Sequence, residues 1–228
     1  MKTTQITGLF IFLVALHTSA DDIKFSELRV FLSNNSFANT QTSLNNQTAP
    51  DNVEKFSQLT GVGLEADARV RPWLKVGSRI KGVWNSVYPP NPPSPATSYL
   101  QISQYSAGLL ARVSIAEKEW LQADIFAELG LANTKIDIQT ISAGKGTYTK
   151  DSGLYQRAGI SVGMGSPALK IYAEAGQEFN NLGTPSYAGT LTVNNVTNVV
   201  LSGPYYAVGI IISGLPSWIK PGTVTVGK

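Results

Sequence analysis

The chain has 228 residues, a length that suits one β-barrel or one to two ordinary domains. Charged residues make up only 14% of it, where about 25% is typical of soluble domains. The formal net charge of +3 is too small to predict nucleic-acid binding, which needs basic side chains clustered on one face. The chain has no cysteine, and this excludes disulfides, thiolate nucleophiles, cysteine-ligated zinc and a lipid-modified cysteine.

The first twenty residues have the plan of a cleaved secretory signal peptide. Lys2 gives a basic start, residues 8–16 form an apolar stretch, and Thr18, Ser19 and Ala20 are small residues before a cleavage site. A membrane-anchoring helix is less favoured, because it needs about 20 apolar residues. We therefore expect residues 1–20 to be removed, together with the single histidine of the chain.

The rest of the chain shows a repeated alternation of apolar and polar residues. In residues 60–70, apolar side chains occupy every second position, and Glu65, Asp67 and Arg69 share the other parity. This period of two predicts β-strands with one apolar and one charged face. We expect eight strands, over residues 25–33, 60–70, 74–81, 107–115, 121–131, 157–164, 169–178 and 206–212.

The expected strands are joined by two kinds of connection. Short ones lie near residues 71–73, 116–119 and 165–168. Long polar ones lie near residues 34–55, 88–98, 141–152 and 180–203. Because the two kinds alternate, every long loop is predicted to leave the barrel from the same end. Segment 88–98 holds five prolines and does not suit a central strand, whereas residues 191–201 are predicted to form a hairpin beyond the barrel.

Glycine indicates which face of the strands points inward. The charge-bearing parity holds Gly61, Gly63, Gly77, Gly108, Gly130, Gly159, Gly163 and Gly176. A glycine weakens a strand and usually marks a close approach of other atoms. The lumen of an eight-stranded barrel is barely wide enough for side chains, so long charged residues there need glycine neighbours. The charged face is therefore predicted to line the lumen, and the apolar face to contact lipid.

The charges on this face nearly cancel, which suits an enclosed space where an unpaired charge is costly. A solvated outer face of mixed sign would look similar. The predicted structural network in the lumen comprises Glu65, Asp67, Arg69, Lys75, Arg79, Lys81, Arg112, Asp124, Glu128, Arg157, Lys170, Glu174 and Glu178.

Aromatic residues fall at two levels of the expected barrel. Trp73 and Trp120 follow short turns, and Tyr88, Tyr99 and Tyr105 lie at or near the opposite end. Girdles of amphipathic rings at two levels are typical of membrane barrels, although rings packed at hairpin ends would give the same pattern. An even strand number with short periplasmic turns places both termini in the periplasm and the long loops outside.

Together these features resemble the small eight-stranded outer-membrane β-barrels of Gram-negative bacteria, the superfamily of the OmpA transmembrane domain, OmpX and OmpW. The resemblance covers about residues 23–215 and is one of architecture. It implies an all-β, antiparallel, up-and-down transmembrane barrel, monomeric and with a plugged or very narrow lumen. Its partners would be outer-membrane lipid, lipopolysaccharide and the barrel-assembly machinery.

The corresponding division of the chain is a signal peptide at 1–20, the barrel at 21–216 and a short periplasmic tail at 217–228. The tail departs from the family pattern, because such proteins usually end on the last strand with an aromatic residue. Either the assembly signal is internal here, or assembly follows another rule.

Catalysis and cofactor binding are not expected. Outer-membrane lipid A deacylases and phospholipases resemble serine hydrolases that rely on histidine as the general base, and omptin proteases use histidine together with acidic residues. The processed chain has no histidine. The acidic pairs Glu65 with Asp67 and Glu174 with Glu178 each share a face. A packed lumen gives a substrate no entry to them, so ion pairing is favoured over acid–base chemistry.

Four functional hypotheses stay open at this point. The favoured one is an integral barrel with a structural or surface role, without catalysis, its lumen closed by the charged network. The second is a narrow OmpW-like pore for small solutes. The third is an adhesin or receptor that binds an extracellular ligand through its long loops. The fourth is a soluble, lipocalin-like carrier with the apolar stripes inside.

Overall fold

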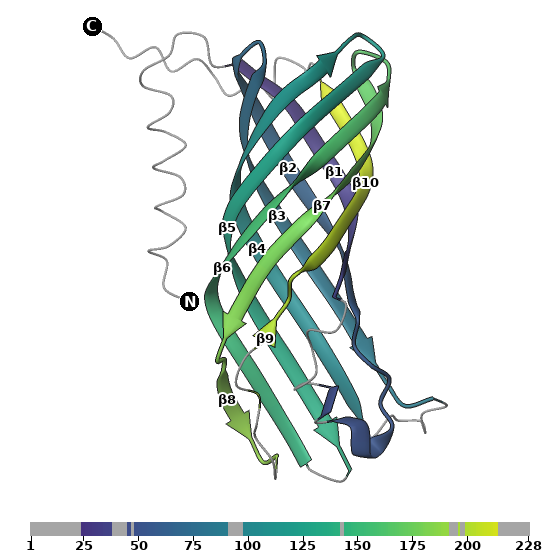
Figure 1. Cartoon of the computed structure of the whole chain (residues 1–228), viewed down its shortest axis with the longest axis vertical. Coiled ribbons are helices and arrows are strands. Elements are labelled where there is room, and N and C mark those ends of the chain that lie inside the picture. The colour runs from purple at the N-terminus through teal and green to yellow at the C-terminus, as the bar shows by residue number, and fades with distance from the viewer. Residues whose placement is uncertain are drawn as a thin grey trace, which may run out of the picture.

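The computed structural model describes residues 24–37, 45–46, 48–90, 98–141, 144–191, 196 and 199–213. Its frame is a ring of eight strands, drawn in Figure 1. The ring consists of β1 (Lys24–Ser36), β2 (Gln58–Arg71), β3 (Leu74–Val87), β4 (Tyr99–Glu117), β5 (Leu121–Thr140), β6 (Gly144–Gly165), β7 (Leu169–Gly183) and β10 (Gly203–Ser213). The short strands β8 (Ser186–Gly189) and β9 (Val199–Val200) and the 3-10 turn η1 (Ala49–Asp51) lie outside the ring.

Each strand of the ring pairs antiparallel with its neighbour in the chain. The ring closes where β10 pairs with β7 on one side and with β1 on the other. The short connections after β2, β4 and β6 gather at one end of the barrel, which we call the short-turn end (Figure 1), whereas the short connection between β5 and β6 lies at the opposite end. The opposite end is the long-loop end. The expected fold, an eight-stranded antiparallel up-and-down barrel, is confirmed.

Strands β4, β5 and β6 are far longer than predicted, with 19, 20 and 22 residues. The predicted long loop at 141–152 is wrong, because β5 continues to Thr140 and β6 begins at Gly144, with Lys135 paired to Thr149. These segments are rich in polar residues, which resemble a loop by composition. They form strands nonetheless because the alternation continues, with polar side chains now on the outer face.

Residues 192–195, 197 and 198 of the hairpin predicted over 191–201 lie outside the described residues. In the described part of this segment, Val199 and Val200 pair with the end of β7, and the preceding strand β8 pairs with β6 instead. The predicted signal peptide at 1–20 and the predicted tail at 217–228 lie outside the described residues. Among the residues that are described, no helix is long and apolar enough to cross a membrane.

The interior of the barrel changes in character along its axis. Toward the short-turn end it holds charged side chains and a small aromatic and aliphatic cluster. Toward the long-loop end it is an apolar core, to which the strand ends contribute Leu100, Ile102, Ile136 and Ile138. The connecting segments complete this core with Phe37, Val53, Phe56, Leu191, Val196 and Leu201.

Glycines on the inward parity allow the interior to pack closely. A Cβ added to Gly130 would lie 2.4 Å from the Ala107 carbonyl oxygen and 2.6 Å from the ring of Tyr155. A Cβ added to Gly63 would lie 2.2 Å from the ring of Phe31. Both glycines therefore leave space that an aromatic side chain of a nearby strand occupies.

We expect Gly130→Ala to lower the free energy of unfolding by about 1–3 kcal/mol, because the backbone oxygen of Ala107 gives the new methyl group no room. The matched control is Gly82→Ala on the outer face, where a Cβ would meet only the ring of Tyr105, at 3.3 Å. Urea unfolding in lipid vesicles, followed by tryptophan fluorescence, measures both variants. Equal stability of the two would contradict the inward crowding.

Candidate functional site

The apolar side chains of the strands point outward and the charged ones inward. Leu64 is 44% exposed and Ile125 is 50% exposed, whereas the adjacent Glu65 and Asp124 are each only 1% exposed. Other large apolar side chains exposed on the outer surface are Leu32, Val62, Ile80, Val113, Leu129, Ile160, Val162, Leu169, Ile171 and Val208. This arrangement is the reverse of a soluble barrel, whose apolar side chains fill the core.

At the centre of the charged interior, Glu65 on β2 joins arginines from two other strands. Its Oε1 accepts a hydrogen bond from Arg112 Nε on β4 at 2.6 Å. Its Oε2 accepts from Arg79 Nε on β3 at 2.7 Å and from Arg112 Nη2 at 2.8 Å. Arg29 Nε on β1 lies 3.4 Å from Oε1. One buried carboxylate is therefore surrounded by three guanidinium groups.

The opposite wall supplies acids to the same arginines. Glu174 on β7 accepts from Arg79 Nη1 at 2.8 Å and from Arg112 Nη2 at 2.8 Å. Glu128 on β5 lies 3.3 Å from Arg79 Nη1 and accepts from Arg157 Nη1 at 3.0 Å. The contacts of Arg79 and Arg112 with Glu174, and of Arg79 with Glu128, cross the lumen and connect strands that do not pair with each other, whereas Glu128 and Arg157 are neighbours on the paired strands β5 and β6.

The network continues toward both ends of the barrel. Toward the long-loop end, Glu178 Oε2 accepts from Arg157 Nη2 at 2.7 Å and from Lys81 Nζ at 2.9 Å. Toward the short-turn end, Glu27 accepts from Lys75 Nζ at 2.6 Å and from Arg29 Nη2 at 2.8 Å. The ion pairs therefore form a continuous column along the interior.

The buried charges of the described residues cancel. Seven are basic and seven are acidic. The basic residues are Arg29, Lys75, Arg79, Lys81, Arg112, Arg157 and Lys170, and the acidic residues are Glu27, Glu65, Asp67, Asp124, Glu128, Glu174 and Glu178. A buried charge is tolerated only when it is paired and hydrogen-bonded, so neutrality of the whole column is a condition for its stability.

Aromatic rings separate the layers of this column. The guanidinium of Arg157 lies 4.0 Å from the centroid of the Tyr205 ring, and that of Arg79 lies 4.9 Å from the Phe31 ring. Arg112 lies 5.0 Å from the Phe126 ring. Planar guanidinium groups stack well on aromatic faces, and the rings fill space beside the arginines that further charges would otherwise occupy.

Of the thirteen residues predicted for the lumen network, all but Arg69 are buried. Arg69 lies at the rim, where it pairs with Glu117, and both side chains are 35% exposed. Asp67 Oδ2 lies 3.5 Å from Arg29 and Arg112, beyond hydrogen-bonding distance. Lys170 is buried and has no ion-pair partner among the described residues.

Sequence reasoning missed Glu27 and Arg29 of β1, which belong to the same network. Their parity was visible, but the strand alternates poorly because Phe31 occupies an inward position. The buried rings of Phe126, Tyr155 and Tyr205 were missed for the same reason. An aromatic residue on the charged parity weakens the pattern, although it is what stacks on the arginines.

The predicted interfacial aromatics lie at three levels. Trp73 and Trp120 are 55% and 56% exposed at the short-turn end. Tyr105, with 70% exposure, lies beside Gly82 on β3. Tyr88 and Tyr99 lie further toward the long-loop end, with their ring centroids 6.3 Å apart. Other exposed aromatic residues, missed earlier, are Trp84, Phe179 and Tyr206.

The outer surface changes from apolar to polar at one level of the barrel. On β5 the outward residues are apolar up to Leu131 and then become Asn133, Lys135, Asp137 and Gln139. The same change occurs on β4, where the outward residue Tyr105 is followed toward the long-loop end by the polar residues Ser103 and Gln101. Ser103 pairs with Lys135 and Gln101 with Asp137, so the change falls at the same level on both strands. The apolar interior core begins at the same level. Past this point the strands therefore have the ordinary polarity of a water-soluble protein.

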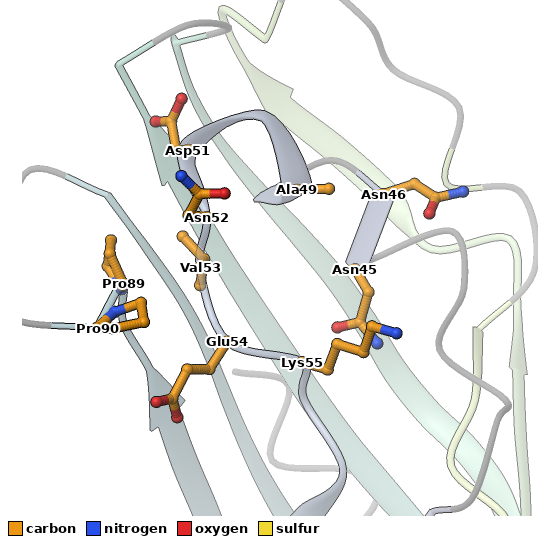
Figure 2. Close-up of a pocket in the computed structure, with 10 residues that line it drawn as sticks. All are labelled: Asn45, Asn46, Ala49, Asp51, Asn52, Val53, Glu54, Lys55, Pro89 and Pro90. Carbon is orange, nitrogen blue, oxygen red and sulfur yellow. The ribbon is translucent and has the colours of Figure 1, made fainter.

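A surface cavity of about 690 Å³ lies at the long-loop end (Figure 2). The residues that line it are Asn45, Asn46, Ala49, Asp51, Asn52, Val53, Glu54, Lys55, Pro89 and Pro90. The segment around η1 is fixed by Asn45, whose Oδ1 accepts a hydrogen bond from the Phe56 N–H at 2.9 Å. It is fixed further by Asp51, which accepts from Ser98. The polar side chains that line the cavity include amide, carboxylate and ammonium groups.

Comparison with known proteins identifies the fold and nothing narrower. No family model matches the chain, and no curated protein matches it. Among solved structures, Neisserial surface protein A matches with a TM-score of 0.51 and 12% identity, over 85% of this chain and all of that one. The fold is shared. Ail of Yersinia pestis matches with a TM-score of 0.46 and 12% identity, over 84% of this chain and all of its own. CarO of Acinetobacter baumannii matches with a TM-score of 0.39 and 10% identity, over 82% of this chain and 97% of its own.

We expect Glu65→Gln to lower the free energy of unfolding by about 3–5 kcal/mol, because it leaves buried arginines without a compensating charge. Glu117→Gln is the matched control: it breaks a pair that is partly exposed to solvent, and we expect a loss of about 0–1 kcal/mol. Urea unfolding of both variants in vesicles gives the difference. If Glu65→Gln unfolds at the urea concentration of the wild type, the network does not hold the barrel together.

Proposed function

We propose that the chain is an integral outer-membrane β-barrel with a structural or surface role, that its lumen is sealed by the charged column, and that it catalyses no reaction. The observation that supports this most is the reversed polarity of the barrel, with apolar side chains exposed and ion pairs buried. A surface of this kind is unstable in water and stable in lipid. The shared fold with a neisserial surface protein supports the same location.

The length of the apolar belt fits a bilayer. The belt runs over residues 105–115 of β4 and 121–131 of β5, eleven residues in each strand. A tilted strand needs about 9–11 residues to cross the hydrocarbon region. Exposed Trp73 and Trp120 mark one edge of the belt, and exposed Trp84 and Tyr105 mark the other, as expected of interfacial rings.

The long-loop end then projects from the membrane into the surroundings of the cell. Outside the belt, the polar outer face and the apolar core are those of a water-soluble domain, which needs no lipid contact. Short turns on the periplasmic side and long loops outside are the usual orientation of such barrels. Both termini are then periplasmic.

The contents of the lumen support a sealed barrel rather than a pore. The central arginines each contact acids on two or more strands, and aromatic rings fill the spaces between them. Opening a path would require breaking several buried ion pairs, each of them costly to separate. The apolar core at the long-loop end adds a second barrier to ions.

A role in recognition is the second candidate, and the cavity beside η1 supports it. This cavity lies at the end proposed to face the surroundings and is lined by amide, carboxylate and ammonium groups, including Asn46, Asn52, Glu54 and Lys55. Its volume is in the range of small-ligand sites.

The position of the membrane can be measured with single cysteines, because the chain has none of its own. We expect a nitroxide at Leu129→Cys to be relaxed by oxygen, which concentrates in lipid, and one at Lys135→Cys to be relaxed by a water-soluble nickel chelate. In intact cells, an impermeant maleimide should label Lys135→Cys but not Lys118→Cys at the short-turn end. Labelling of position 118 alone would reverse the orientation, and equal relaxation at positions 129 and 135 would contradict the proposed belt.

Conductance tests the seal. We expect the wild-type protein to show no stable channel in planar bilayers and no liposome swelling with small sugars, because the column fills the lumen. The double variant Arg79→Ala/Glu174→Ala removes a neutral pair from the centre, and it should produce measurable openings. A large, stable wild-type channel would contradict the sealed lumen, while swelling with sugars would favour the narrow pore.

A further inference from the structure

One buried cation in the lumen has no acid beside it. The residue Lys170, near the start of β7, is 7% exposed and lies on the inward parity. Each of the other six buried cations among the described residues has a carboxylate within 4.0 Å. A buried ammonium without a counter-charge is costly, and its retention calls for an explanation.

The side chain of Lys170 lines a cavity of about 320 Å³ at the short-turn end. Glu27 and Gln122 line the same cavity from the lumen, and Arg69, Glu117 and the turn residues after β4 line it from the rim. The cavity therefore lies at the short-turn end of the charged column, between the buried charged residues and the exposed turn residues. Its volume is at the lower end of the range for small-molecule sites.

The acids of this cavity are already engaged. Glu27 accepts hydrogen bonds from Lys75, Arg29 and Gln122, at 2.6, 2.8 and 3.1 Å. Glu117 pairs with Arg69. The exposed turn residues Lys118 and Glu119 cancel each other in charge. Of the buried charged residues that line the cavity, Lys170 is the one that has no oppositely charged group within 4.0 Å among the described residues.

We propose that this cavity binds a carboxylate, either on a small organic acid or on a peptide, and that Lys170 is the residue that recognises it. A single unpaired ammonium matches a carboxylate, which carries one negative charge. A phosphate dianion would bring a second negative charge close to Glu27 without a cation to meet it. The ammonium group binds as a compact charge with three donors, which suits the end of a carboxylate.

In the orientation proposed above, the ligand comes from the periplasm. Binding itself depends neither on that orientation nor on a sealed lumen, and it is measured on the purified full chain in detergent micelles. Failure of this proposal is therefore distinct from failure of the proposed function, which conductance and labelling test.

The experiment is a titration of the deuterated, 15N-labelled protein, followed by its backbone amide resonances. The probes are acetate, N-acetylglycine, N-acetylglycinamide as an uncharged analogue, and inorganic phosphate. We expect saturable shifts at residues 169–171 and 121–123 with acetate or N-acetylglycine, no saturation with the amide, and at least tenfold weaker binding of phosphate. Tighter binding of acetate indicates a small acid, and tighter binding of N-acetylglycine indicates a peptide end.

Lys170→Met should weaken carboxylate binding at least tenfold, and Lys145→Met, which alters an exposed lysine at the opposite end, should not change it. Lys170→Met leaves no acid unpaired, so the barrel should fold, as heat-modifiable gel mobility will show; Lys170→Gln is the second variant. Equal binding by the wild type and these variants would overturn the proposal. No saturable shift with either carboxylate, equal binding of the amide, or phosphate binding as tight as carboxylate binding would overturn it as well.

Discussion

The cost of an unpaired charge in a narrow enclosed space determines most of this structure. The interior of an eight-stranded barrel has room for side chains and little else. Once arginines occupy that space, each needs acids on the facing wall and aromatic or glycine neighbours beside it. Glu65 with three guanidinium groups around it, and Gly130 beneath the ring of Tyr155, are two results of this one requirement.

The barrel combines two structures of opposite polarity in the same eight strands. Between the short-turn end and the level of Asn133, the strands are apolar outside and charged inside. Between that level and the long-loop end, they are polar outside and apolar inside. Neither half requires special strand geometry, because a period of two serves both. In the proposed placement, apolar residues face outward where the barrel is surrounded by lipid, and they face inward where it is surrounded by water. The long strands β4, β5 and β6 carry most of this change.

The sequence allowed the ring of eight strands, their inward parity and most of the charged residues to be predicted, because alternation and glycine placement are local signals. It led to a wrong prediction of a loop at 141–152, since polar residues such as Lys145, Thr147 and Thr149 resemble a loop in composition although they lie on the outer parity of a strand. Partners across the lumen, such as Arg79 with Glu174, could not be predicted either. Their distance depends on how the ring closes, and no spacing along the chain encodes it.

The same cross-lumen pairing has a consequence for how the proposed membrane barrel is inserted. Arg29 on the first strand contacts Asp124 on the fifth, and Arg79 on the third contacts Glu174 on the seventh. In a partly assembled sheet, charged side chains therefore lack their partners on the strands that have not yet joined, and in a membrane these unpaired charges would be exposed to lipid. The ion-paired side chains of the lumen are all enclosed with their partners only when β1 pairs with β10 and closes the ring. For the proposed membrane barrel, we therefore expect insertion to be coupled to closure of the ring, because hairpins that entered one by one would expose unpaired charges to lipid.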